Sequence, residues 1–524
     1  VVKARALSSK NGTPISSNIP GGRKMIAGQT GDWLQARARA TPQATAVVIG
    51  NKCWNYSQLN DLVDQAAFNL RGFASRGARV AALLPNDLAF VCLIHALARS
   101  GALLVPLNSR LSAEELNWQL ARANCTALVF DQAAVAQVSK IKSEGIQLVP
   151  ASDLFATDST RSEESTPSRA LEDFQAILFT SGTTGRPKGA MLTFSNHFYS
   201  AMASAYRLGV SPDDRWLCCL PLYHVGGMAI LLRSCLYGTA VELHDGFDTA
   251  AVSDSLDSGK ITLISLVPTM LQRLLHQRGG RSWPASLRHV LLGGAAVPVE
   301  LVAVCKDLGI PASITYGLTE AASQVATMPP EGVFRKPGSA GKPLLFTSVA
   351  VVSEDGRELP TGEPGEIIVR GPTVMAGYDQ DKESTAAALQ NGWLHTGDIG
   401  TLDEDGDLWV MQRRDDIIIS GGENVYPAEV ESVLKSHPAV SQACVVGIQD
   451  QEWGQRVAAA VSLTASEQTS IDELLAFCRQ RLAGYKLPRQ VLILQTLPHT
   501  ASGKIHRQTV AELLNEDKQG SAGG

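Results

Sequence analysis

Hydrophobic and polar positions alternate along this chain with two different periods from about residue 32 onward. Between Leu59 and Leu70 apolar side chains recur every three or four residues, the spacing of an amphipathic helix. The next segment, Arg79–Leu84, is short, almost wholly apolar and followed by Pro-Asn, which predicts a buried strand and a turn. Further strand-like segments, separated by helix-like sequence, are Ala176–Thr180, Ile261–Val267 and His289–Leu292.

Strands that alternate with helices predict an α/β fold whose sheets are largely parallel. The pattern changes after about residue 345, where short strands and tight turns occupy Gly362–Arg370 and Asp403–Val410. This change predicts a β-rich subdomain. From Arg413 to the end, helix-like and strand-like segments mix and predict a compact α+β domain.

Length and composition place the chain among multidomain globular proteins. Its 524 residues correspond to roughly two to four domains. A content of 44% hydrophobic and 19% charged residues excludes global disorder. The net charge of −5 argues against a protein that coats nucleic acid or an anionic membrane surface, so an anion site needs local positive charge.

Cysteine usage and hydropathy indicate a reducing, aqueous setting. The nine cysteines are odd in number and include no Cys-x-x-Cys pair, so neither a disulfide framework nor a zinc ribbon is indicated. His95, Arg99 and Ser100 interrupt the apolar stretch Val91–Leu107, and no run reaches the roughly 18 residues of a membrane span. We therefore predict a cytoplasmic protein without membrane insertion or a nucleic-acid partner.

The first residues differ in composition from the rest of the chain. Residues 1–24 contain five basic and no acidic side chains, and they lack the apolar core of a secretory signal. We predict that residues 1–30 form a flexible extension with Met25 as the natural start, and a transit peptide is the alternative. Residues 157–168 contain seven Ser or Thr and are predicted to form a surface connection.

The most distinctive local pattern is Thr180–Gly189, which reads Thr-Ser-Gly-Thr-Thr-Gly-Arg-Pro-Lys-Gly and follows a strand-like segment. Its glycines let backbone N–H groups approach an anion, its hydroxyls donate hydrogen bonds and Lys188 supplies charge. The alternative is an exposed polar turn. The pattern is not a Walker loop, in which Gly-Lys-Ser/Thr is required, and the chain contains no GxGxxG or GxSxG motif.

The loop resembles the phosphate loop of the adenylate-forming superfamily, which includes acyl-CoA synthetases, adenylation domains of peptide synthetases and beetle luciferases. The resemblance continues in order over nearly the whole chain, from about Gly31 to Arg507. A single motif of this kind is weak support, whereas the ordered set is strong. The other motifs are Pro221–Gly227, Tyr316–Glu320, Thr396–Asp398, Arg413–Pro427 and Thr500–Ile505.

The resemblance implies a division of the chain and a reaction. Residues 31–412 would form an adenylation domain of two layered α/β subdomains plus the β-rich subdomain, and residues 413–524 a small mobile α+β domain. In the family, a carboxylate attacks the α-phosphate of ATP to give acyl-adenylate and pyrophosphate, and a thiol then releases AMP. The implied ligands are ATP, Mg²⁺, coenzyme A and a small carboxylic acid, with a homodimer left open.

The resemblance also assigns residues to the nucleotide. Thr319 would donate to the phosphates, and Glu320 would hold Mg²⁺, which prefers carboxylate oxygen. Tyr316 would stack on adenine, and Asp398 and Arg413 would bind the ribose from opposite sides. The full implied set is Thr180, Ser181, Gly182, Thr183, Thr184, Lys188, Gly293, Gly294, Ala295, Tyr316, Gly317, Thr319, Glu320, Asp398 and Arg413.

Lys504 matches the family lysine that bridges the carboxylate and the α-phosphate in the first step. It follows Gly503 in a short turn, which suits a mobile loop that presents one charge. With Lys504, the implied catalytic set contains Lys188, Thr319 and Glu320.

For the second step the family rotates its C-terminal domain about a position that matches Asp415, where many members have Lys. The rotation would bring small residues beside the tunnel for the pantetheine arm. The residues implied to line this path are His224, Gly226, Gly227, Ser420, Gly421 and Gly422.

Within the superfamily, the chain is most similar to the o-succinylbenzoate–CoA ligases of menaquinone biosynthesis. This similarity rests on Thr193–His197, on Arg233, on Ser323 with Gln324, and on Ser339–Pro343 followed by Thr396–Gly400. A cation in an acyl pocket suits an acid with a second carboxylate and opposes a plain fatty chain. The alternative is that Arg233 points to solvent. The implied acyl-pocket residues are His224, Arg233, Ser323 and Gln324.

Other functions stay open at this level. The same chemistry could act on a fatty or aryl acid, or the adenylate could be oxidised as in luciferases, although no local pattern requires oxygen chemistry. The chain could also be a module that loads a carrier protein, but no carrier-like serine motif follows Arg507. An inactive nucleotide-binding protein is disfavoured because Lys188, Glu320, Asp398 and Lys504 are all present.

Overall fold

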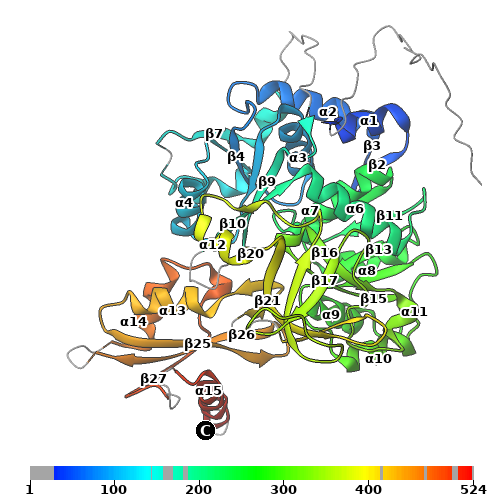
Figure 1. Ribbon diagram of the computed structural model, residues 1–524. Coiled ribbons are helices and arrows are strands. Elements are labelled where there is room, and N and C mark those ends of the chain that lie inside the picture. The colour runs from blue at the N-terminus through cyan, green and yellow to red at the C-terminus, as the bar shows by residue number, and fades with distance from the viewer. Residues whose placement is uncertain are drawn as a thin grey trace, which may run out of the picture.

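The computed structural model describes residues 29–142, 144–156, 169–180, 187–412, 417–464, 469–498 and 505–521. The first α/β unit (blue to cyan in Figure 1) lies above the second (green), and the C-terminal part (orange to red) lies below the first. A short pairing of β1 (Gln29–Thr30) with β8 (Arg169–Ala170) joins two distant segments. The extension expected before residue 29 and the connection expected at 157–168 lie outside the described residues.

The first sheet runs in the order β19-β10-β9-β5-β4-β6-β7 within the described chain. It is parallel from β9 to β7 and antiparallel at the β10–β19 edge. The strands are β4 (Arg79–Leu83), β5 (Leu103–Pro106), β6 (Ala127–Phe130), β7 (Gln147–Pro150), β9 (Phe174–Thr180), β10 (Lys188–Thr193) and β19 (Gly377–Tyr378). Its helices are α2 (Tyr56–Asn69), α3 (Leu88–Ser100), α4 (Ala113–Arg122) and α5 (Val135–Val138).

The second sheet runs in the order β16-β15-β14-β13-β11-β12-β2-β3 and is also parallel except at its two edges. The strands are β2 (Thr45–Ile49), β3 (Lys52–Asn55), β11 (Arg215–Cys218), β12 (Ala240–Leu243), β13 (Leu263–Leu266), β14 (His289–Leu292), β15 (Ala312–Leu318) and β16 (Ser323–Met328). Its helices are α1 (Trp33–Ala40), α6 (Phe194–Leu208), α7 (Val225–Tyr237), α8 (Thr249–Asp257), α9 (Pro268–Arg278), α10 (Val299–Asp307) and α11 (Pro330–Val333).

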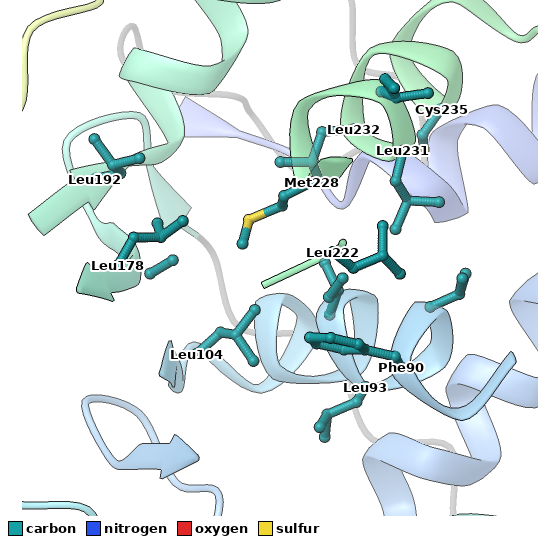
Figure 2. Close-up of a cluster of buried hydrophobic side chains, with 14 of the residues drawn as sticks. Phe90, Leu93, Leu104, Leu178, Leu192, Leu222, Met228, Leu231, Leu232 and Cys235 are labelled. Atoms are coloured by element: carbon teal, nitrogen blue, oxygen red, sulfur yellow. The ribbon is translucent and has the colours of Figure 1, made fainter. Parts of the chain in front are cut away.

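Successive side chains of each strand point to opposite faces of the sheet, and this separates a central core from two outer cores. In β4, Val80 and Ala82 belong to the central core, whereas Ala81 and Leu83 face the outer core under α4. Figure 2 shows Phe90 of α3 on the side of that helix toward Leu222 and toward α7, which carries Met228 and Leu231, in the central core. The two α/β units therefore share one continuous apolar layer, which fixes the helices of one unit against those of the other.

The ends of α6 and α7 have local causes in the sequence. Thr193 caps α6 by accepting from the backbone of Asn196, whose side chain in turn accepts from the Thr193 N–H, and α6 ends at Gly209. Helix α7 ends at Gly238, whose φ of +81° is in the left-handed region that glycine tolerates. These caps matter because both helices carry side chains of the candidate site.

The remaining described strands form two antiparallel-rich sheets. The β-rich subdomain contains β17 (Ser348–Val352), β18 (Gly365–Arg370), β20 (Leu389–Gln390), β21 (Trp393–Leu402) and β22 (Leu408–Gln412), with α12 (Lys382–Ala388) beside it. The C-terminal sheet contains β23 (Ile418–Ser420), β24 (Glu423–Val425), β25 (Val440–Asp450), β26 (Gly454–Leu463) and β27 (Gln490–Leu494), with α13 (Pro427–Lys435), α14 (Ile471–Arg479) and α15 (Arg507–Ser521). The predicted fold class, with two α/β units, a β-rich subdomain and a small C-terminal domain, is confirmed.

Candidate active site

A cavity of about 1370 Å³ lies where both α/β units meet the C-terminal domain. Pockets for one small ligand commonly measure about 300–1,000 Å³, so this cavity has room for more than one ligand. Its wall includes the carboxyl ends of parallel strands, where α/β folds usually bind ligands. These ends contribute Thr180 at the end of β9, Val267 after β13, Gly293 after β14 and Thr319 after β15.

One end of the cavity brings together the residues expected to bind phosphate. Thr180 and Lys188 are paired across β9 and β10, so both stand at the base of the loop between these strands. Thr180 Oγ1 donates to Glu320 Oε1 over 3.2 Å, and the Tyr378 hydroxyl donates to the same oxygen over 2.9 Å. The Lys188 ammonium lies 5.3 Å from the Tyr378 ring centroid. Outside the described residues lie Ser181, Gly182, Thr183 and Thr184, so their roles stay predictions.

The next stretch of wall is formed by bare backbone. Gly293 and Gly294 line the cavity, and a Cβ at residue 293 would lie 2.7 Å from Thr315 Cγ2. Only glycine fits there, which leaves the peptide plane open to a flat ring. Gly317 and Thr319 continue this wall, whereas Ala295 is not among the lining residues.

Tyr316 and Asp398 form a buried pair behind and beside this wall. The Tyr316 hydroxyl donates to Asp398 Oδ2 over 2.7 Å. Asp398 lines the cavity but Tyr316 does not, so stacking of Tyr316 on adenine stays a prediction. Arg413 and Asp415, the position that matches the family hinge, fall between β22 and β23, outside the described residues. Lys504 also lies outside the described residues.

Arg233 of α7 also lines the cavity. Its side chain is 2% exposed, so the alternative that it points to solvent is wrong. Nη2 donates to Ser200 Oγ over 3.1 Å, while Nε has no hydrogen-bond partner and no described carboxylate pairs with the guanidinium. Burial lowers the pKa of Arg233, an effect that Tyr237 partly opposes. A buried cation without an anion is costly and calls for a negatively charged ligand.

Neutral polar groups surround Arg233. His197 on α6 is fully buried, and burial together with the charge of Arg233 lowers its pKa to about 3, so the imidazole is neutral at physiological pH. Ser323 and Gln324, which follow Thr319 closely in sequence, also line the cavity, and Gln324 Nε2 donates to Thr327 Oγ1 over 3.1 Å. Their contact with an acid stays a prediction. Arg233 therefore supplies positive charge to this part of the cavity wall.

The C-terminal domain closes the cavity through Glu423, which the sequence patterns did not single out. Its carboxylate accepts from the Tyr223 hydroxyl over 3.0 Å and from Arg110 Nη1 over 3.4 Å, and it lies 3.1 Å from His224 Nε2. Burial alone would raise the pKa of Glu423, but His224, Arg110 and the hydrogen bond from Tyr223 lower it to about 2. The carboxylate is therefore ionised at neutral pH and joins the two domains.

Small residues shape the passage beside this contact. A Cβ at Gly227 would lie 2.3 Å from the Pro221 carbonyl oxygen, so the start of α7 packs directly on the backbone before it. Gly421 and Gly422 have φ of +60° and +84° and line the cavity. His224 and Gly226 also line it as expected, whereas Ser420 is buried in β23 behind it.

A second buried charge cluster joins the domains. Lys486 Nζ lies 2.6 Å from Glu115 Oε1 of α4 and 2.7 Å from Glu429 Oε1 of α13. All three side chains are nearly or wholly buried. Burial raises the pKa of Glu429, although the Lys486 charge opposes the shift. Lys486 thus holds two carboxylates, one from each domain, close together.

Two family models match the chain. A model of AMP-binding enzymes matches residues 34–379, and a model of their C-terminal domain matches residues 429–504. The chain belongs to the AMP-binding enzyme family. A 2-succinylbenzoate–CoA ligase of Bacillus cereus strain Q1 is 42% identical over 487 residues, which cover 93% of this chain and 99% of that protein.

Two solved structures of one relative differ in how well they superpose. A double mutant of o-succinylbenzoate CoA synthetase from Bacillus subtilis, bound with a product analogue, has a TM-score of 0.88. The same synthetase with its acyl-adenylate intermediate has a TM-score of 0.72. Each is 38% identical and covers 92% of this chain and 98% of its own. At the same identity and coverage, this AMP-binding enzyme superposes more closely on the product-analogue complex than on the acyl-adenylate complex.

One carboxylate cluster away from the cavity could hold a metal ion. It contains Asp403, Asp405 and Asp407, the single such group of three or more potential ligands found among the described residues. The Lys336 ammonium lies within 2.6–2.7 Å of an oxygen of each, so the lysine already occupies the position of a cation.

Among the helices that the structure describes, none combines the length and hydrophobicity needed to cross a bilayer.

Replacing Lys486 by Met should destabilise this AMP-binding enzyme by about 3–5 kcal/mol, because Glu115 and Glu429 would face each other without a cation. Carboxyl groups with raised pKa values lose folded-state stability as pH rises through those values. The deficit should therefore be larger at pH 8 than at pH 5. Urea unfolding at both pH values measures it. The control Lys435→Met, at the exposed end of α13, should change stability by less than about 0.5 kcal/mol; a deficit independent of pH would contradict the expectation.

Proposed function

We propose that this chain is an ATP-dependent acid–CoA ligase that converts o-succinylbenzoate to o-succinylbenzoyl-CoA through an acyl-adenylate, releasing AMP and pyrophosphate. The named ligase from Bacillus cereus matches nearly its whole length with this chain. The observation that carries the choice of acid is Arg233, a cation buried in the cavity wall without a carboxylate partner among the described residues. The product belongs to menaquinone biosynthesis.

The charge of o-succinylbenzoate fits the two ends of the cavity. Its succinyl carboxylate is the group to be activated, and its ring carboxylate stays anionic throughout. Binding the ring carboxylate against Arg233 pairs a buried cation that has no carboxylate partner among the described residues. A fatty acid offers only methylene groups there and would leave the guanidinium unpaired, which disfavours that alternative.

In the first step the acid carboxylate and the ATP phosphates repel each other. Lys188 places positive charge at the phosphate end, and Lys504 would add a second charge at the α-phosphate. The oxygen donors there, the Glu320 carboxylate beside the Thr180 hydroxyl, fit Mg²⁺, which when bound neutralises phosphate charge. Thr319 lines the same part of the wall and can donate a hydrogen bond to a phosphate.

The second step needs a path for the thiol of coenzyme A. The observed arrangement, with Glu423 against His224 and the Gly421–Gly422 turn beside Val267, suits this step. Bare backbone at the two glycines lets a narrow pantetheine arm pass. In this proposal the contact of Glu423 with its three neighbours holds the domain in place while the thiol attacks the adenylate.

The proposed setting is the cytoplasm, with ATP, Mg²⁺ and coenzyme A supplied there. The nine cysteines form no disulfide, and all except Cys53 are buried, as suits a reducing compartment. A homodimer stays a prediction.

The function is tested by measuring AMP release with ATP, Mg²⁺, coenzyme A and a panel of acids. The panel contains o-succinylbenzoate, benzoate, succinate, malonate and a medium-chain fatty acid. We expect o-succinylbenzoate to give the highest kcat/KM by about 100-fold or more, because only it meets both ends of the cavity. Preference for a monocarboxylate would keep the ligase chemistry and refute the assignment to menaquinone biosynthesis.

Replacing Arg233 by Leu should raise the KM for o-succinylbenzoate by about 30-fold, the loss of one charged hydrogen bond of about 2 kcal/mol. The KM for 4-oxo-4-phenylbutanoate, which lacks the ring carboxylate, should change by less than about threefold. Initial rates of pyrophosphate release measure both values. The control Arg357→Leu alters a side chain that is 80% exposed and should affect neither; equal changes for both acids would remove Arg233 from acid recognition.

Replacing Lys504 by Ala should reduce adenylate formation by about 100-fold or more, because the developing charge at the α-phosphate loses its cation. Transfer from preformed acyl-adenylate to coenzyme A should fall by less than about fivefold. Single-turnover measurements separate the two half-reactions. Lys435→Ala serves as the exposed control. Equal losses in both half-reactions, with the melting temperature unchanged, would refute the role given to Lys504.

A further inference from the structure

A single hydroxyl connects Arg233 to the turn that follows Glu320. Ser200 on α6 is 2% exposed. Its Oγ donates to the Ala322 carbonyl oxygen over 2.7 Å and accepts from Arg233 Nη2 over 3.1 Å. A serine hydroxyl has one proton to give, so these two bonds use it as a donor in one direction and an acceptor in the other. The hydroxyl is thus a link between a helix-borne cation and a backbone turn.

The turn held by Ser200 is strained. Ala322 and Ser323 have φ of +50° and +96°, two consecutive residues outside the regions that side chains with a Cβ favour. Such a conformation is unfavourable for residues with a Cβ, so it persists only where the surroundings fix it. The turn also packs closely on β15, since a Cβ at Gly317 would lie 1.7 Å from the Ser323 carbonyl oxygen.

The strained turn follows directly on the residues of the phosphate end. Thr319 and Glu320 immediately precede it, and both line the cavity. Ser323 follows Ala322 and lines the cavity as well. A shift of the Ala322 carbonyl would therefore move the Glu320 carboxylate and the Thr319 hydroxyl, which lie two and three residues earlier and are proposed to face the nucleotide.

We propose that Ser200 is a positioning residue that couples acid binding to nucleotide binding. Its hydroxyl ties Arg233, which meets the second carboxylate of the acid, to the turn that presents Thr319 and Glu320. The inference rests on the proposed function and adds a connection between its two substrates.

The coupling follows from the hydrogen-bond capacity of Arg233. Within the described residues, Nε has no hydrogen-bond partner, and the Nη2 bond to Ser200 is the one hydrogen bond of the guanidinium. A carboxylate on the guanidinium fixes its plane, which holds Nη2 on the Ser200 oxygen and directs the hydroxyl proton to Ala322. Hydrogen bonds arranged in such a chain strengthen one another. By linkage, if bound nucleotide increases the affinity for the acid, bound acid increases the affinity for the nucleotide by the same factor.

The test is the affinity for α,β-methylene-ATP with Mg²⁺, an analogue that cannot release pyrophosphate, measured by titration calorimetry. Each protein is saturated either with o-succinylbenzoate or with 4-oxo-4-phenylbutanoate. In the wild type the first acid should tighten nucleotide binding by about fivefold or more relative to the second. In Ser200→Ala this ratio should fall to within about twofold of one, whereas Ser200→Thr, which keeps a hydroxyl, should retain most of it.

Ser204→Ala is the matched control. Ser204 lies one turn further along α6, is equally buried and bonds to neither Arg233 nor Ala322; its variant should keep the wild-type ratio. A wild-type ratio near one, an unchanged ratio in Ser200→Ala, or an equal loss in Ser204→Ala would each overturn the positioning role. If Ser200→Ala does not fold, Ser200→Cys, with a weak donor of similar size, takes its place and should lower the ratio.

The proposed function can fail separately. A wild-type protein that releases no pyrophosphate from ATP with o-succinylbenzoate would refute the acid assignment. A wild type that turns over this acid, together with a Ser200→Ala variant that keeps its ratio, would refute the coupling alone.

Discussion

Two anions must share one cavity, and the repulsion between them is the constraint that the rest of the site meets. The chain as a whole carries a net charge of −5, so attraction comes from cations at fixed points. Lys188 stands at the base of the phosphate loop, and Arg233 lines the same cavity from α7. Gly293 and Gly294 add bare backbone to the wall, without charge or bulk. Positive charge is thus supplied to the ligands by particular side chains rather than by the chain as a whole.

The central core gives these charges their positions. Arg233 shares α7 with Met228 and Leu231, which pack against α3 of the other α/β unit (Figure 2). A core packed at this density resists displacement, so the cation stands where the joined sheets put it. Ser200 is placed in the same way by α6, a helix with its own cap at Thr193. The geometry of acid recognition is therefore a consequence of how the two α/β units pack.

The sequence predicted features that are local and missed those that depend on distant contacts. Segments such as Arg79–Leu84 were recognised because a strand buried on both faces is apolar throughout, and β4 covers Arg79–Leu83. Arg233 stood out because a charge is rare within apolar helical sequence. Glu423 did not, since its partner His224 lies 199 positions earlier and no periodicity joins them. Tyr378 and Lys486 were missed for the same reason, and the roles at the nucleotide came from the family resemblance rather than from spacing.

The contact of the C-terminal domain with the rest of the chain combines ions with apolar packing. Glu423 and Lys486 each meet charged or polar partners from the preceding units, and Ala483 belongs to the outer core under α4. Water can solvate the ionic groups if such a contact opens, whereas exposed apolar surface favours association with other molecules. The ionic share of the contact therefore limits how much apolar surface a separated C-terminal domain would expose.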